Sequence, residues 1–269
     1  MNISISTYTL FSMPVQEAVE ELIQRGWKSI EIMGDGDHHG KLLFQMDEVQ
    51  LQSIANFAQE NEVTFGLHLP IAKFNPATFN EETLDTWNKC LPVIQKLQVK
   101  YVLLHLGKHV STRQGMENVV QFIQKMLVEL PKNTKVVIEN VPNEEYSIGT
   151  SVDELIEIIN RVQSDRLFIM FDTGHGFMNC ESDEEFMKEF EKATDYLFGL
   201  HISDNHGEED EHLGIGEGKI SFKQLFLNCK ELKLELVLET NSVQRAEQSR
   251  QEIAQYLNML EGTECRKSN

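Results

Sequence analysis

Eight apolar runs alternate with longer amphipathic stretches along the chain, and this alternation constrains the fold more than any other feature. The runs are expected to be strands and span Ile3–Thr7, Ser29–Met33, Thr64–Leu69, Tyr101–Leu106, Lys135–Asn140, Leu167–Asp172, Phe198–Ser203 and Leu234–Thr240. Most are apolar on both faces, as parallel strands are when helices cover them outside and side chains pack inside. Successive runs begin about 26 to 37 residues apart, which is the length of one strand-plus-helix unit.

The stretches between these runs carry helical signals. In Pro14–Gly26, apolar residues recur every three or four positions, with a proline at the start and a glycine at the end. Ser151–Arg161 repeats the pattern, and Ser182 precedes an acidic turn as a helix N-cap would. Eight such units without a linker predict one α/β domain, a single (β/α)8 TIM barrel, over residues 1–261. Residues 262–269 are expected to form a C-terminal tail.

Composition and charge narrow the class of protein. Of the 269 residues, 41% are hydrophobic and 25% are charged, a balance typical of globular domains rather than disordered or fibrous chains. No apolar run approaches the roughly 20 residues of a membrane helix, and the first residues lack signal-peptide features, so we expect a cytoplasmic protein. The cysteines form no CxxC pair and are expected to be reduced: Cys90, Cys180, Cys229 and Cys265. A net charge of −19 disfavours broad nucleic-acid binding unless another group supplies positive charge.

All nine histidines are expected at one end of the barrel, at the carboxyl end of a strand or in the loop that follows it. They are His38, His39, His68, His105, His109, His175, His201, His206 and His212. These segments hold about a third of the chain, so chance would rarely place every histidine there, and this is the end where such barrels build active sites. Any one histidine could still be a hydrogen-bonded core or loop residue. His38 and His39, in the loop Gly34–Gly40, could contact a substrate, but an exposed polar turn is expected for them.

Three expected strands also end in a carboxylate: the fifth in Glu139, the sixth in Asp172 and the eighth in Glu239. Unpaired carboxylates buried in the barrel mouth would be costly, so they require cations. Lysine is scarce at these strand ends, whereas histidine with carboxylate is a ligand set for Zn²⁺, Mn²⁺ or Fe²⁺. His175 follows Asp172 across a glycine turn, so that both could face one cavity. These residues predict a metal site.

The segment after the seventh strand adds further candidates. His201 could be a ligand, with Asp204 as the acceptor that orients its ring. Asp210 and His212 lie in a polar loop, residues 205–218, whose later glycines predict that the loop folds back tightly.

With these residues in order, the chain resembles the xylose isomerase-like barrel superfamily and, within it, the endonuclease IV branch (the AP endonuclease 2 family). The strings IEN, FDTGH, HISD, DEHLGIGEG and LET are similar to family motifs, and the similarity runs from the first strand to the eighth. The resemblance implies nine metal ligands in three groups, of which the first two share one glutamate. The groups are His68, His105 and Glu139; Glu139, Asp172, His201 and Glu239; and His175, Asp210 and His212.

The resemblance implies a metal-dependent hydrolase that cleaves a phosphodiester, in abasic DNA or a small phosphorylated substrate. Up to three ions, Zn²⁺ foremost, would be bound, and Glu139 would orient the attacking water. Four carboxylates (−4) and three divalent ions (+6) would give the site a charge of about +2, which would attract an anion. Where the family has an aromatic residue that wedges DNA, this chain has Ile71–Phe74, with Phe74 as its aromatic residue; the family's proline after the second histidine is Leu106.

The wider superfamily implies an alternative, a sugar or sugar-phosphate isomerase or epimerase. One Mn²⁺ or Mg²⁺ on Glu139, Asp172, His201 and Glu239 would polarise the substrate, and Glu139 and Glu239 would move a proton as the catalytic pair. This alternative leaves the remaining candidates without a role unless they bind sugar hydroxyls. A third possibility is a metal-binding barrel without catalytic activity. No membrane or protein partner is implied.

Overall fold

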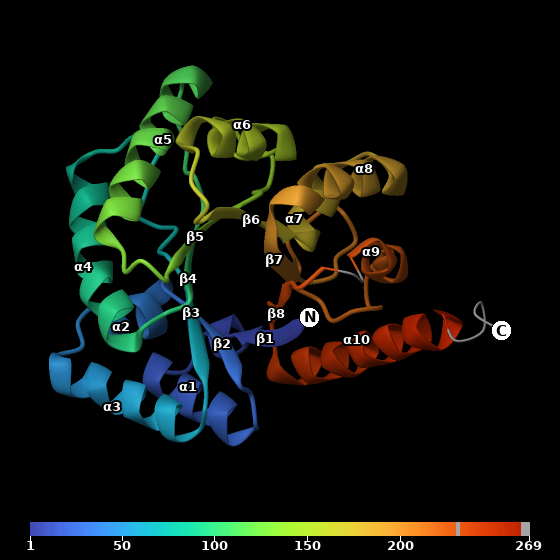
Figure 1. Cartoon of the computed structure of the whole chain (residues 1–269), viewed down its shortest axis with the longest axis horizontal. Coiled ribbons are helices and arrows are strands. Elements are labelled where there is room, and N and C mark those ends of the chain that lie inside the picture. The colour runs from blue at the N-terminus through green and yellow to red at the C-terminus, as the bar shows by residue number, and fades with distance from the viewer. Residues whose placement is uncertain (230–231, 265–269) are drawn as a thin grey trace.

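The eight apolar runs form parallel strands that close into a barrel, with helices outside it (Figure 1). The computed structural model describes residues 1–229 and 232–264. The strands are β1 (Asn2–Ser6), β2 (Ser29–Met33), β3 (Thr64–His68), β4 (Tyr101–Leu104), β5 (Lys135–Glu139), β6 (Leu167–Asp172), β7 (Leu197–Ile202) and β8 (Glu235–Leu238). They pair in chain order, and β1 closes the barrel by pairing with β8. The predicted (β/α)8 TIM barrel is confirmed, and predicted strand ends differ from the observed ones by about two residues at most.

Helices follow the strands and cover the outer face of the barrel (Figure 1). They are α1 (Val15–Gln24), α2 (Lys41–Leu43), α3 (Glu48–Glu60), α4 (Glu81–Leu97), α5 (Thr112–Glu129), α6 (Val152–Val162), α7 (Thr173–Met178), α8 (Asp183–Ala193), α9 (Phe222–Cys229) and α10 (Val243–Glu264), with short helical turns η1 (Thr7–Leu10), η2 (Gly36–Gly40) and η3 (Thr194–Tyr196). As predicted, α1 begins directly after Pro14. Ser151 and Ser182 cap α6 and α8, because each hydroxyl accepts a backbone N–H from the first turn.

The C-terminal helix α10 runs along one side of the barrel (Figure 1). It continues to Glu264 and so includes the first residues of the segment 262–269 that the sequence predicts to be a tail. Residues 265–269, with Cys265, lie outside the described part of the chain. The other three cysteines are free. Among the described residues, no helix is both long and apolar enough to cross a membrane.

Alternation along the strands determines which side chains enter the barrel. A small cluster of buried residues fills the interior, separate from the main core between strands and helices, and it includes Val137, Met170 and Val237. Successive side chains on a strand point to opposite faces, so a residue two positions later points the same way. Two positions after Val137, Met170 and Val237 stand the three predicted acids at the ends of β5, β6 and β8: Glu139, Asp172 and Glu239. The sequence therefore directs these three carboxylates into the barrel mouth.

Candidate metal centre

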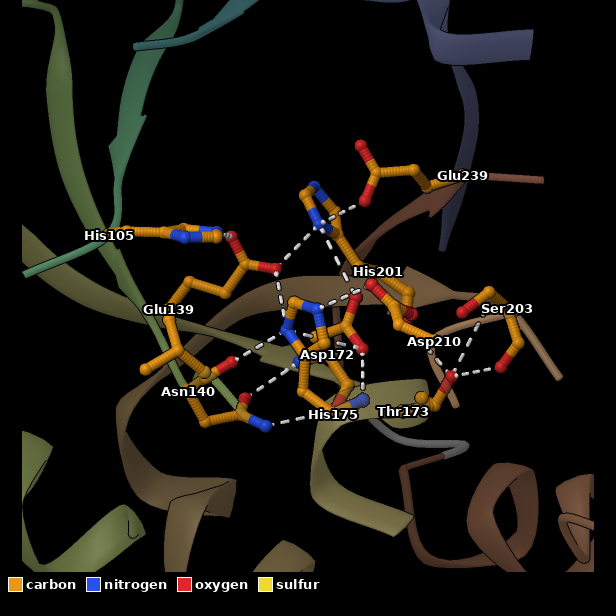
Figure 2. Close-up of polar contacts among 12 residues, drawn as sticks. His105, Glu139, Asn140, Asp172, Thr173, His175, His201, Ser203, Asp210 and Glu239 are labelled. Carbon is orange, nitrogen blue, oxygen red and sulfur yellow. Dashed lines mark hydrogen bonds and ion pairs between the residues drawn. The ribbon is translucent and has the colours of Figure 1, made fainter. Parts of the chain in front are cut away.

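Glu139, at the end of β5, lies at the centre of the site and is completely buried. Its Oε2 is 3.1 Å from Nε2 of His105 and 3.5 Å from Nε2 of His68. Its Oε1 is 2.9 Å from Nδ1 of His201 and 3.7 Å from Nδ1 of His175. Figure 2 shows this carboxylate between His105 on one side and the other two labelled imidazoles on the other. Glu139 thus faces two sets of donors at once, as a bridging ligand would.

A second set of donor atoms, from Glu139, Asp172, His201 and Glu239, surrounds Nδ1 of His201 on β7. Oε2 of Glu239 lies 3.2 Å from this nitrogen and Oδ2 of Asp172 lies 3.7 Å from it. The other oxygen of each acid is held by the fold: Oδ1 of Asp172 accepts the backbone N–H of His175 at the start of α7, and Oε1 of Glu239 accepts the Ser6 hydroxyl. One oxygen of each carboxylate is therefore positioned and the other faces the interior of the site.

The third donor set consists of His175, Asp210 and His212. Its members meet around Asp210, whose side chain is 32% exposed. Its Oδ2 lies 3.2 Å from Nε2 of His175 and 3.1 Å from Nε2 of His212. His212 has a left-handed backbone with φ of 49°, which is uncommon for a residue other than glycine. Its ring Nδ1 and its carbonyl are held by the backbone of Glu239 and Asn241. Backbone strain of this kind is typical of functional sites.

Electrostatics show how strongly these carboxylates depend on nearby positive charge. Burial alone would raise the pKa of Glu139, but the imidazoles of His201 and His105 hold it well below its usual range. Burial would likewise raise the pKa of Glu239, and His201 lowers it to about 2. Burial raises the pKa of Asp172 to about 6, and Glu139 adds to this effect. The charge of each acid therefore depends on the balance between burial, which favours the neutral carboxyl group, and the imidazoles beside it.

Divalent ions fit this arrangement. The donor atoms of His68, His105 and Glu139 lie within 4.8 Å of one another, and so do those of Glu139, Asp172, His201 and Glu239. Two buried oxygens that face these sets, Oε2 of Glu139 and Oδ2 of Asp172, accept no hydrogen bond from any described group. Buried carboxylate oxygens are otherwise hydrogen-bonded or bound to metals. Imidazole with carboxylate is also a donor set that zinc and manganese accept.

All nine predicted ligand side chains therefore meet at one end of the barrel, but the predicted role of Asp204 is wrong. Its carboxylate turns away from His201 and accepts the backbone N–H groups of Gly216, Gly218 and Ile220. An aspartate beside a strand end can satisfy loop amides as readily as a ring nitrogen, and sequence proximity does not distinguish the two. These bonds fold the loop back tightly, as its glycines predict.

One further expectation fails because loop residues pack on one another. His38 is exposed as predicted, but His39 is fully buried against the ring of Phe11. Phe74 is also buried, at 3% exposure, and its ring packs on that of Phe122. It therefore presents no aromatic surface to DNA.

Two polar residues of the site region were not predicted. Asn140 accepts the backbone N–H of Asp172, and its own carbonyl faces Nδ1 of His175 (Figure 2). Glu31, at the middle of β2, is completely buried, and its Oε1 lies 3.0 Å from Nε2 of His201. An acid inside a buried apolar strand, SIEIM, is the sequence signal that could have identified Glu31.

A cavity of about 550 Å³ opens beside the third set. Its lining includes His105, His175 and Asp210 of the site together with Lys73 and Lys108. A larger cavity of about 1060 Å³ lies between α3 and α4, but none of the nine side chains lines it. The smaller cavity is therefore the one that can hold a substrate against the site.

Comparisons with known proteins agree with this architecture. A family model described as xylose isomerase-like TIM barrel matches residues 19–260. The uncharacterized protein MJ1311 of Methanocaldococcus jannaschii is 24% identical across 97% of this chain and 90% of its own length. A probable endonuclease 4 of Thermosipho africanus is 33% identical over 53% of this chain and 58% of that protein. The crystal structure of a D-tagatose 3-epimerase-like protein shares the fold, with a TM-score of 0.83 and 22% identity over 98% of this chain and 99% of the other. The chain belongs to the xylose isomerase-like TIM-barrel family.

Proposed function

We propose that this protein is a metal-dependent hydrolase of phosphate esters, with up to three divalent ions, Zn²⁺ foremost. The observation that carries the proposal is the third set, in which one oxygen of Asp210 lies between the ring nitrogens of His175 and His212. A reaction that needs one ion has no use for this set, whereas phosphoester hydrolysis uses several ions to stabilise both the attacking and the leaving oxygen. The nine ligands are His68, His105, Glu139, Asp172, His175, His201, Asp210, His212 and Glu239.

Ions bound here would supply Lewis acidity and lower the pKa of a water molecule toward 7. The chain's own residues would position the reactants. Glu139 faces the first two donor sets with its two oxygens, so that it is placed to accept a hydrogen bond from the attacking water and to orient it. It is therefore proposed as a catalytic residue together with Glu239, which faces the same nitrogen of His201 from another strand.

The cavity favours a small phosphorylated substrate over duplex DNA. Lys73 lies on the cavity wall with an exposed side chain, and no described residue forms an ion pair with it. Lys108, by contrast, pairs with Glu144. A free lysine beside the site is suited to a phosphoryl oxygen, whereas a net charge of −19 and the buried Phe74 disfavour a long DNA contact.

The test combines a metal count with a substrate screen on the full chain. Elemental analysis after purification without chelators should give close to three ions per chain. Hydrolysis should be detected with small phosphodiesters or monoesters, and a duplex with one abasic site serves as the DNA substrate. One ion per chain and no hydrolysis of any of these substrates would contradict the proposal.

The second candidate is a sugar isomerase or epimerase that uses Mn²⁺ or Mg²⁺. It is favoured by one observation: the four-residue set of Glu139, Asp172, His201 and Glu239 is fully buried and compact without the third set. Glu139 and Glu239 would then exchange a proton with the substrate. Turnover of ketoses or ketose phosphates with one ion per chain would support this candidate.

A further inference from the structure

Glu31 lies within the barrel below the metal centre and belongs to none of the three donor sets. Its Oε2 accepts the hydroxyl of Tyr101 at 2.8 Å, and its Oε1 is 3.0 Å from Nε2 of His201. Oε1 of Glu31 and Nε2 of His201 have no hydrogen bond to any described group, so their 3.0 Å approach is an ion-pair contact between two otherwise unpartnered atoms. All three side chains are at most 1% exposed. Glu31 therefore joins a fixed hydroxyl to one face of a proposed ligand.

The contact between Tyr101 and Glu31 requires that residue 66 has no side chain. Tyr101 lies on β4 and Glu31 on β2, with β3 between them. A Cβ atom at Gly66 of β3 would overlap the end of the Tyr101 ring. The ring also packs on Phe198, with 4.7 Å between centroids. Glycine at position 66 thus leaves the space through which the tyrosine reaches across to the acid.

The other ring nitrogen of His201 faces the proposed metal ligands. Nδ1 lies 2.9 Å from Oε1 of Glu139 and 3.2 Å from Oε2 of Glu239. A carboxylate that accepts the second N–H of a histidine ligand fixes the ring orientation and leaves the first nitrogen free to bind. We propose that Glu31 is a positioning residue that keeps Nδ1 of His201 directed at the metal centre, and that Tyr101 holds Glu31 for this purpose. The inference rests on the proposed metal-dependent function.

Metal affinity tests the inference in the full chain. Metal-free protein is titrated with Zn²⁺ against a competing chelator, for wild type, Glu31→Leu and the milder Glu31→Gln and Tyr101→Phe. Glu235→Leu is the matched control, because Glu235 is also a buried acid of the barrel but binds Ser29 and Asn2 instead of a histidine. Glu31→Leu should weaken binding of one ion by about 10- to 100-fold, and the milder variants by less. If the leucine variants fail to fold, Glu31→Gln is compared with Glu235→Gln.

Unchanged zinc affinity in the Glu31 variants, or an equal loss in the Glu235 control, would overturn the inference. A second measurement is independent of activity: ¹⁵N NMR of the histidine rings, with His201 assigned from the His201→Gln spectrum. Wild type should show a slowly exchanging Nε2–H on His201, and Glu31→Leu should lose its protection. A rapidly exchanging or absent Nε2–H in wild type would also overturn the inference. If these effects are observed but no phosphate ester is hydrolysed, only the proposed function fails.

Discussion

His175 reaches Asp210 across 35 residues of chain, and its Nε2 lies 3.2 Å from Oδ2 of that acid. The same oxygen is 3.1 Å from Nε2 of His212, so the loop after β7 completes a donor set that α7 begins. The opposite ring nitrogen of His175 is 3.0 Å from the carbonyl of Asn140, which fixes the orientation of its ring. This loop therefore supplies two of the three side chains of the third donor set.

Replacing His212 by alanine should remove the proposed third ion and most of the hydrolytic activity. We expect the metal content to fall from about three ions to two and kcat to fall by roughly 100-fold, because the third set loses one of its three ligands. Elemental analysis and steady-state kinetics measure the two effects. His206→Ala is the control, since His206 belongs to the same loop but is exposed, and among the described residues its ring pairs with Glu211 alone. Full activity in His212→Ala would contradict the trinuclear site.

Removal of metal should lower the thermal stability. Without an ion, the buried carboxylates Glu139, Asp172 and Glu239 face one another with only imidazoles between them. Ligand at a hundredfold excess over Kd stabilises a fold by about 2.7 kcal/mol, which corresponds to a Tm shift of roughly 5–10 °C for a chain of this size. A chelator should produce this decrease in wild type, zinc should reverse it, and Glu139→Gln should respond much less. Identical melting with and without chelator would count against a resident ion.

The sequence predicts the fold and the convergence of the candidate side chains at one end of the barrel, because both follow from local patterns. Apolar runs mark the strands, and in a parallel barrel every strand ends at the same face, so acids and histidines at strand ends must converge there. The contacts of Glu31 do not follow from such a pattern. They depend on the barrel diameter, which places Glu31 of β2 near His201 of β7, and on the space at Gly66, through which Tyr101 of β4 reaches Glu31.

Loop packing is the other feature that the sequence does not reveal. His39 lies in a polar, glycine-flanked segment that is typical of an exposed turn. It is buried because Phe11, from the loop after β1, covers it. Asp204 illustrates the same limit, since three of the backbone amides that it accepts lie more than ten residues later in the chain. Contacts between loops are tertiary, and residue type alone does not specify them.

Lys73 should contribute to substrate binding rather than to catalysis. Its side chain is exposed on the cavity wall and unpaired among the described residues. Lys73→Ala should therefore raise KM for a phosphorylated substrate about tenfold with kcat nearly unchanged, a loss of about 1.4 kcal/mol of binding free energy. Lys132→Ala is the control, because Lys132 is an exposed lysine that precedes β5 and so lies at the opposite end of the barrel. Equal KM values for wild type and Lys73→Ala would exclude this role.

His39 should make stability depend on pH in a defined window. Burial lowers its pKa to about 4. The folded state therefore keeps the ring neutral while the unfolded chain binds a proton near pH 6.5, so its contribution is full above pH 6.5 and is lost as pH falls toward 4. The total change is about 3 kcal/mol. Urea unfolding measures the test: between pH 7 and 4, His39→Phe should lose less stability than wild type by about this amount. The control His38→Phe, at the exposed neighbouring position, should lose as much stability as wild type. The same dependence of the unfolding free energy on pH in all three proteins would contradict the assignment.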